Sequence, residues 1–150
     1  MPTKLEKLIV YTDGGARGNP GPAALGVVIS DAKGKLIKQY GERLGIKTNN
    51  EAEYAAVISA LQKIKALYGK EKTRKIIVEM RMDSEFVSKQ LNGAYKIEEE
   101  RLFPFFIKIW NLKMNFGKIS FSHVPRAQNK DADKMVNEAL DGGSGPTLFG

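Results

Sequence analysis

Residues 8–22 have the sequence LIVYTDGGARGNPGP, in which an apolar run of β-forming residues ends at Asp13 and gives way to glycine and proline. The apolar run predicts a first strand over residues 4–13. The glycine, asparagine and proline that follow predict a turn over residues 14–22. An aspartate that starts a turn is common, so Asp13 has no functional meaning until the rest of the chain is considered.

The segments on either side of this stretch define the fold class. Two more β-forming runs follow closely enough to form an antiparallel meander with the first strand. The apolar spacing then changes to a helical period, and strand and helix patterns alternate to the end. The predicted elements are strands at 23–30 and 35–44, a helix at 51–68, a strand at 76–82, helices at 84–91 and 98–114, a strand at 119–123 and a helix at 129–140. This order predicts an α/β fold with a mixed five-stranded sheet, three antiparallel strands and then two further strands, and helices on both faces.

Length and charge limit the organisation of the chain and its partners. The 150 residues include 24 basic and 17 acidic side chains, which gives a net charge of +7. We expect one domain over residues 1–141 and a flexible tail over residues 142–150. The sequence has no apolar run of membrane-spanning length and no signal-peptide pattern, so no membrane association is expected. The positive charge suggests a polyanionic partner.

The chain has no cysteine and a single histidine. This excludes disulfides, thiolate nucleophiles and histidine-rich zinc centres. A chain without cysteine fits a reducing compartment, and we expect a cytoplasmic location. Any metal would have to be held by carboxylates, which favour Mg²⁺, Mn²⁺ or Ca²⁺.

Four carboxylates stand at predicted element ends. Asp13 and Asp83 end strands, whereas Glu53 and Asp133 lie in the first turns of helices. Each has an ordinary structural explanation: a turn start for Asp13, a capping box with Asn50 as N-cap for Glu53, an N-cap for Asp83 and a favourable dipole position for Asp133.

The four carboxylates gain meaning as a set, because a mixed sheet can bring these element ends to one edge. Their repulsion there would cost several kcal/mol unless cations bridge them. Two divalent ions about 4 Å apart would relieve that cost, and would also stabilise the attacking and leaving oxygens of a phosphodiester.

Four motifs occur together in a specific order. The first joins YTDGG at 11–15 with GNPGP at 18–22, and the others are TNNEAE at 48–53, DS at 83–84 and NKDAD at 129–133. Together they resemble type 1 ribonuclease H, in the form without a basic handle, over roughly residues 6–140. The resemblance implies an endoribonuclease that hydrolyses the RNA strand of RNA–DNA hybrids by a two-metal-ion mechanism, leaving 3′-hydroxyl and 5′-phosphate ends.

The resemblance also implies roles for individual residues. Asp13, Glu53, Asp83 and Asp133 match the metal-binding carboxylates, which would hold two Mg²⁺ ions, or Mn²⁺, with substrate bound. The residues that match substrate-contacting positions are Gly14, Gly15, Asn19, Thr48, Asn49, Asn50 and Ser84. Glycine permits close backbone approach to the RNA strand, and contacts with 2′-hydroxyls distinguish RNA from DNA.

The chain departs from the family pattern in two places. The loop before the last helix, where the family carries a catalytic histidine, has Arg126 instead. Arg126 is a candidate for ordering the scissile phosphate, but it cannot shuttle protons because it stays charged. The single histidine, His123, lies on the apolar side of its strand and is expected to be packed.

The second departure is in residues 92–114, which have no basic handle. The aromatic side chains there, including Phe103 and Trp110, are expected to pack in the core. Residues 70–75 are expected to form a solvated loop.

Two alternatives to the nuclease remain open. One is a non-catalytic module that binds hybrids or double-stranded RNA on the same fold, and the other is a related nuclease such as a DNA-strand transferase. Double-stranded RNA is a further candidate substrate, and the chain is expected to be a monomer.

Overall fold

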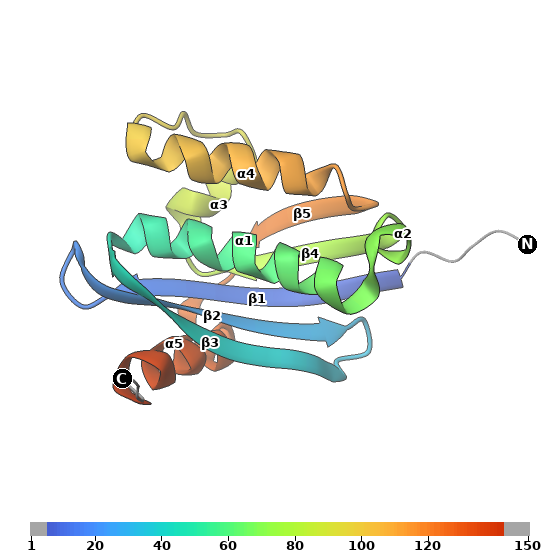
Figure 1. The fold of residues 1–150 in the computed structure, drawn as a ribbon, viewed down its shortest axis with the longest axis horizontal. Helices are drawn as coiled ribbons and strands as arrows, with labels where there is room; N and C mark the ends of the chain where they lie inside the picture. The colour runs from blue at the N-terminus through green and yellow to red at the C-terminus, as the bar shows by residue number, and fades with distance from the viewer. Residues whose placement is uncertain (1–5, 143–150) are drawn as a thin grey trace, which may run out of the picture.

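Five strands form one mixed sheet in the order β3-β2-β1-β4-β5, in a computed structural model that describes residues 6–142 (Figure 1). The strands are β1 (Glu6–Ala16), β2 (Gly21–Asp31), β3 (Leu36–Lys47), β4 (Ile76–Met82) and β5 (Lys118–His123). The first three strands pair antiparallel, whereas β4 pairs parallel with both β1 and β5. The predicted α/β fold class is therefore confirmed.

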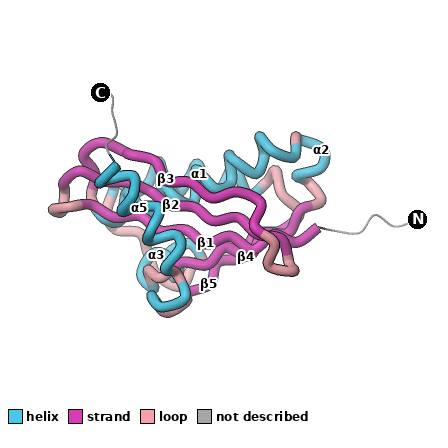
Figure 2. Tube along the Cα trace, turned by 90° about the horizontal axis from the view of Figure 1, so that it is seen from below, coloured by secondary structure: helices cyan, strands magenta, loops and turns pink. Residues whose placement is uncertain are grey.

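Helices cover both faces of this sheet. They are α1 (Asn49–Tyr68), α2 (Lys70–Thr73), α3 (Glu85–Leu91), α4 (Phe103–Lys113) and α5 (Lys130–Gly142), with 3₁₀ turns η1 (Glu100–Leu102) and η2 (Arg126–Gln128). The long helix α1 lies on one face with α4 beside it, and α5 lies on the opposite face against β2 and β3 (Figures 1 and 2). None of the helices in residues 6–142 has the length and apolar character needed to cross a bilayer.

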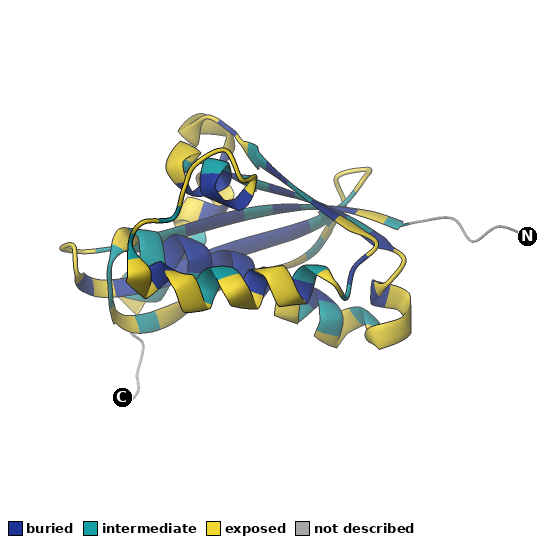
Figure 3. Cartoon of the chain, turned by 90° about the horizontal axis from the view of Figure 1, so that it is seen from above, coloured by how far each residue is buried: buried dark blue, intermediate teal, exposed yellow. Residues whose placement is uncertain are grey.

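The main core lies between α1 and the sheet. In β4, four buried residues from Ile76 to Met82 alternate with half-buried ones, as expected of a strand with one fully covered face. Val57, Leu61 and Ile64 of α1 pack against these strands and have no exposed surface. The buried segments run along the central strands (Figure 3), so this core fixes α1 firmly against β1.

The start of α1 differs from the prediction. Thr48, not Asn50, is the N-cap: its hydroxyl accepts a hydrogen bond from the Glu51 amide at 3.1 Å, and the Glu51 carboxylate accepts one from the Thr48 amide at 2.9 Å. The capping box therefore uses Glu51 and not Glu53. The structural explanation offered for Glu53 is wrong, and its carboxylate is available for another role.

The first turn is shorter than predicted, because β1 continues through the two glycines to Ala16. Gly14, Gly15 and Ala16 pair with Leu25, Ala24 and Ala23 of β2. Small residues on both strands extend the ladder beyond Asp13. As a result, Asp13 lies within the paired part of the sheet and is held rigidly.

Expectations for the fourth helix and for residues 70–75 are corrected, and most of the predicted tail is not tested. The fourth helix begins at Phe103 and not at residue 98, and two of its aromatic residues are exposed: Phe103 at 43% and Trp110 at 57%. Part of the predicted loop at 70–75 forms the short helix α2. Gly142 closes α5, and the rest of the predicted tail, residues 143–150, lies outside the described residues.

Candidate active site

Asp13 and Asp83 meet at one edge of the sheet because β1 and β4 run parallel. Thr12 pairs with Met82 in the ladder; Asp13 is the next residue of β1, and Asp83 is the first residue after β4. Asp13 is 8% exposed and Asp83 is half-buried. The sheet register therefore sets the distance between these two carboxylates.

Glu53 reaches the same edge from α1. The Gly14 amide donates a hydrogen bond to the Glu53 carboxylate, and Glu53 is 7% exposed. A Cβ at Gly14 would lie 2.3 Å from the Ala52 carbonyl and 2.5 Å from the Glu53 amide nitrogen. Only glycine allows α1 to approach β1 this closely, so Gly14 acts here through packing.

Asp133 comes from the opposite face of the sheet, in the first turn of α5. A Cβ at Gly26 would lie 2.1 Å from the Ala132 carbonyl oxygen, and one at Gly41 would lie 2.2 Å from that of Met135. Gly26 and Gly41 face each other across β2 and β3, and Gly26 also pairs with Asp13 in β1. This pair of glycines lets α5 lie against the sheet beside Asp13.

Asn129 holds the start of α5 against the end of β1. It is 1% exposed, and its side-chain amide donates a hydrogen bond to the Thr12 carbonyl at 2.9 Å, which joins the start of α5 to the end of β1. Its backbone carbonyl accepts from the Asp133 amide at 3.1 Å. The sequence motif contained Asn129, but periodicity gave no sign that this residue positions Asp133.

The carboxylates form a compact group. Asp13, Glu53 and Asp83 each offer an oxygen, and these three oxygens all lie within 4.8 Å of one another. Asp133 lies outside that group of three, yet it lines the same cleft and acts electrostatically on Asp13. The structure thus brings together the four carboxylates that the sequence singled out.

Burial and mutual repulsion make this group costly to ionise. Burial, with added repulsion from Asp83 and Asp133, raises the pKa of Asp13 from its ordinary value of 3.8 to about 7. Burial also raises the pKa of Glu53 well above its usual range, and the charges of Asp13 and Asp83 raise it further. Closely spaced oxygen donors that repel one another fit a divalent cation site, because bound cations would remove that repulsion.

The carboxylates line a polar cleft of about 440 Å³ that also carries two arginines. The lining residues are Asp13, Gly14, Gly15, Ala16, Arg17, Asn49, Asn50, Glu53, Asp83, Ser84, Arg126, Asp133, Val136, Asn137 and Leu140. Arg17 pairs with Asp141 at 2.7 Å, whereas Arg126 is exposed in η2. Cations at the edge of an anionic centre suit a phosphate-bearing ligand.

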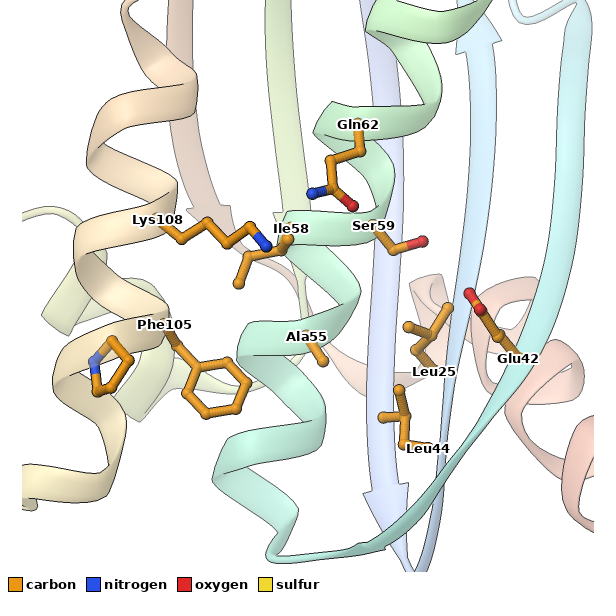
Figure 4. A pocket seen from close by; sticks show the side chains of 10 residues that line it. Leu25, Glu42, Leu44, Ala55, Ile58, Ser59, Gln62, Phe105 and Lys108 are labelled. Atoms are coloured by element: carbon orange, nitrogen blue, oxygen red, sulfur yellow. The ribbon is translucent and has the colours of Figure 1, made fainter.

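A second hollow of about 360 Å³ lies between α1, α4 and the β2–β3 side of the sheet (Figure 4). Leu25, Leu44 and Ile58 make it mainly apolar, and Glu42 and Lys108 are its only charged side chains. It contains no group of acids, so the carboxylate cleft is the candidate active site.

The residues predicted to contact the substrate fall into two sets. Gly14, Gly15, Asn49, Asn50 and Ser84 line the cleft, whereas Asn19 and Thr48 are not among its lining residues. Asn19 instead accepts a hydrogen bond from the Asn49 amide at 2.9 Å, and the Asn49 side chain accepts one from the Ala16 amide at 2.9 Å.

These bonds connect the first turn to the start of α1, so Asn19 supports the cleft indirectly, through its bond to Asn49. Ser84, and not Asp83, is the N-cap of α3, with its hydroxyl accepting from the Val87 amide at 3.1 Å. That leaves Asp83 free to face the other acids.

The position of His123 differs from the expectation. Ile119 and Phe121 are buried on the apolar side of β5, but His123 at the strand end is exposed. Alternation placed His123 on the same side of the strand as Ile119 and Phe121, yet it did not predict that this last residue of the strand is exposed. His123 does not line the cleft, whereas Arg126 does.

Acids from β1, from α1, from the end of β4 and from α5 surround one cleft in a mixed sheet flanked by helices. This arrangement defines the ribonuclease H-like class of proteins. Residues 11–139 match a family model described as reverse transcriptase-like. The chain is 40% identical over 141 residues to ribonuclease HI of Halobacterium salinarum, covering 94% of this chain and 68% of that protein. It is also 34% identical over 136 residues to a bifunctional protein of Mycobacterium tuberculosis, of which it spans 36%.

Comparison with solved structures supports the same class. RNase H1 from Halobacterium salinarum aligns with a TM-score of 0.81 and 41% identity, over 90% of this chain and 98% of that one. LC11-RNase H1, isolated from compost, in complex with an RNA/DNA hybrid aligns with a TM-score of 0.85 and 47% identity, over 89% and 96%. This chain belongs to the type 1 ribonuclease H family.

Proposed function

We propose that this chain hydrolyses the RNA strand of RNA–DNA hybrids by using two Mg²⁺ ions, or Mn²⁺, held by Asp13, Glu53, Asp83 and Asp133. The observation that carries the proposal is the group of three carboxylate oxygens within 4.8 Å of one another. Family membership supports the reaction, and a relative at 47% identity has been solved in complex with an RNA/DNA hybrid.

The proposed reaction is a hydrolysis at phosphorus. A water attacks the phosphorus and the bond to O3′ breaks, which leaves a 3′-hydroxyl and a 5′-phosphate. Bound divalent cations would supply Lewis-acid stabilisation of the charge that develops on the phosphate oxygens. The carboxylates would hold those cations in a fixed arrangement, because Asp13 lies in the β1–β2 ladder, Asp83 directly follows β4, and Glu53 lies in α1.

The chain's own residues would position the substrate around this centre. Gly15 exposes backbone beside the carboxylates, and Asn49 and Asn50 present amides at the cleft that suit sugar and base contacts. Arg126 stands at the edge and would hold the scissile phosphate as a cation. We expect Arg126→Ala to raise KM and lower kcat about tenfold or more, since a charge-assisted contact contributes ~1.5–3 kcal/mol.

A non-catalytic hybrid-binding module is the competing function, and the electrostatics argue against it. Asp13 and Glu53 are buried at the cost of raised pKa values. Such acids repel phosphate, so they would weaken a protein that only binds nucleic acid. A reaction that depends on bound cations would instead require Asp13 and Glu53.

A cleavage assay tests the proposal. Labelled RNA–DNA hybrid, double-stranded RNA and double-stranded DNA are each incubated with Mg²⁺, Mn²⁺ or EDTA. Cleavage of the hybrid's RNA strand in Mg²⁺ or Mn²⁺, and its loss in EDTA and in Asp83→Asn, is expected. Asp131→Asn, an exposed acid in the same α5 turn as Asp133, is the matched control and should keep its activity. A hybrid left intact in both metals would reject the proposal.

A further inference from the structure

We propose that Arg17 binds a backbone phosphate of the substrate at a distance from the scissile bond, and that Asp141 competes with that phosphate for the Arg17 guanidinium. This role rests on the proposed function, since it needs a nucleic-acid strand in the carboxylate cleft. The observation that carries it is an ion pair at the rim of the cleft, in which Arg17 Nη1 lies 2.7 Å from Asp141 Oδ1.

Two walls of the cleft lead from the carboxylates to this ion pair. On one wall, residues 13–17 all line the cleft, and four residues of extended chain put Arg17 roughly 13 Å from Asp13. On the other wall, helix α5 lines the cleft from its first turn to its last, and eight residues of helix put Asp141 about 12 Å from Asp133. The two walls therefore have similar lengths, and the ion pair joins them at the end of the cleft away from the carboxylates.

The backbone of Arg17 is held in place, so its side chain alone can change partner. The Arg17 amide donates a hydrogen bond to the Pro22 carbonyl at 2.8 Å, across the turn between β1 and β2. The Asn19 side chain holds the same turn to α1 through the Asn49 amide. The side chains of Arg17 and Asp141 are 50% and 65% exposed. An ion pair this exposed contributes little to stability, so a phosphate could replace Asp141 at small cost.

The position of Asp141 explains why it competes with a phosphate. The last turn of α5, residues 139–142, has no basic side chain, and the partial negative charge of a helix C-terminus disfavours an acid there. The hydrogen bond from Arg17 lowers the pKa of Asp141, so Asp141 stays ionised at neutral pH. A phosphate offers two oxygens in the arrangement that a guanidinium binds most strongly, so it is the better partner for Arg17.

Arg17 and Arg126 would contact different parts of the substrate. Arg126 lies in η2, which leads into the start of α5 and Asp133, so it stands near the reacting phosphate. Arg17 lies about 12–13 Å along the cleft and would contact a neighbouring phosphate of the strand. Loss of Arg17 should therefore weaken substrate binding and leave the chemical step unchanged.

Fluorescence anisotropy of a labelled RNA–DNA hybrid in EDTA measures binding without cleavage. Arg17→Gln should weaken binding about tenfold or more, because a charge-assisted contact is lost. The slope of log affinity against log salt concentration should also fall by about one. Arg17→Lys keeps the charge and should keep this slope. All three proteins should melt near the same temperature, because the ion pair is exposed.

The competition with Asp141 is tested in the same assay. Asp141→Asn should tighten hybrid binding about two- to fivefold, because Arg17 then has no acid to leave. In the Arg17→Gln background the same change should alter affinity by less than about twofold. Glu138→Gln is the matched control: Glu138 is an exposed acid of the same helix and lies 3.9 Å from Lys134. It should alter affinity by less than about twofold.

Three results would each overturn the proposal. They are equal affinity and salt slope in wild type and Arg17→Gln, weaker binding by Asp141→Asn, and equal tightening by Glu138→Gln. In Mg²⁺ or Mn²⁺, Arg17→Gln should raise KM and keep kcat within about twofold of wild type. A hybrid that shows the expected binding pattern but is never cut would reject the proposed hydrolysis and leave the role of Arg17 intact. A hybrid that is cut by Arg17→Gln with unchanged KM would do the opposite.

Discussion

Replacing Asp13 with asparagine should stabilise the metal-free protein at alkaline pH while it abolishes cation binding and activity. The reason is that Asp13 is held beside Asp83 and Asp133 and is only 8% exposed, so its negative charge is costly in the folded state. Asparagine has nearly the same shape and no charge to bury.

The magnitude follows from the pKa of Asp13, which burial and its acidic neighbours raise from 3.8 to about 7. Between those two pH values the folded protein binds more protons than the unfolded chain, so the free energy of unfolding falls as pH rises. The loss begins near pH 4, ends near pH 7 and amounts to about 4 kcal/mol in total at 1.36 kcal/mol per pH unit. Between pH 5 and pH 8 the expected loss is about 3 kcal/mol, and Asp13→Asn should remove it.

Urea denaturation in EDTA at pH 5 and pH 8, followed by circular dichroism, measures this difference. The wild type should lose stability between the two pH values, and Asp13→Asn should lose much less. The matched control is Asp131→Asn, which should behave as the wild type within about 0.5 kcal/mol. Equal wild-type stability at both pH values, or an Asp13→Asn protein no more stable than wild type at pH 8, would refute the electrostatic account of the site.

Three further predictions concern packing, positioning and metal. Gly14→Ala should destabilise the protein by more than about 2 kcal/mol, because the new Cβ would lie 2.3 Å from an α1 carbonyl; Gly15→Ala, whose nearest contact is at 4.0 Å, should melt near the wild-type temperature. Asn129→Ala should cost about 1–2 kcal/mol in urea through loss of its bond to the Thr12 carbonyl, and kcat should fall while KM changes little; equal losses in both would indicate a general effect on folding. Mg²⁺ or Mn²⁺ should raise the melting temperature of the wild type, reversibly with EDTA, and should not raise that of Asp83→Asn.

The candidate site was predictable where function depends on residue type at an element end. Asp13, Glu53, Asp83 and Asp133 were found because acids stood where strands end and helices begin, in motifs that occur in a fixed order. The role of Glu53 was less certain from sequence, because a capping box with Asn50 explained it equally well. Only the hydrogen bonds of Thr48 with Glu51 removed that explanation.

Solvent exposure was the property that sequence patterns predicted least well. Alternation placed His123 on the apolar side of β5, and the aromatic run suggested that Phe103 and Trp110 pack inside. Periodicity specifies the side of an element on which a residue lies, but not how far neighbouring helices extend over that side. Both errors come from this limit.

The amino-acid sequence by itself determined the order of strands and helices, the fold class and the four acids, because these depend on local propensity, apolar period and motif spacing. The tertiary structure decided how close the acids lie to one another. That distance depends on the parallel pairing of Thr12 with Met82, on Gly14 and the pair Gly26–Gly41 admitting α1 and α5 to the sheet, and on Asn129 joining α5 to β1. Contacts between residues far apart along the chain appear only once the chain is folded, so no local pattern records them.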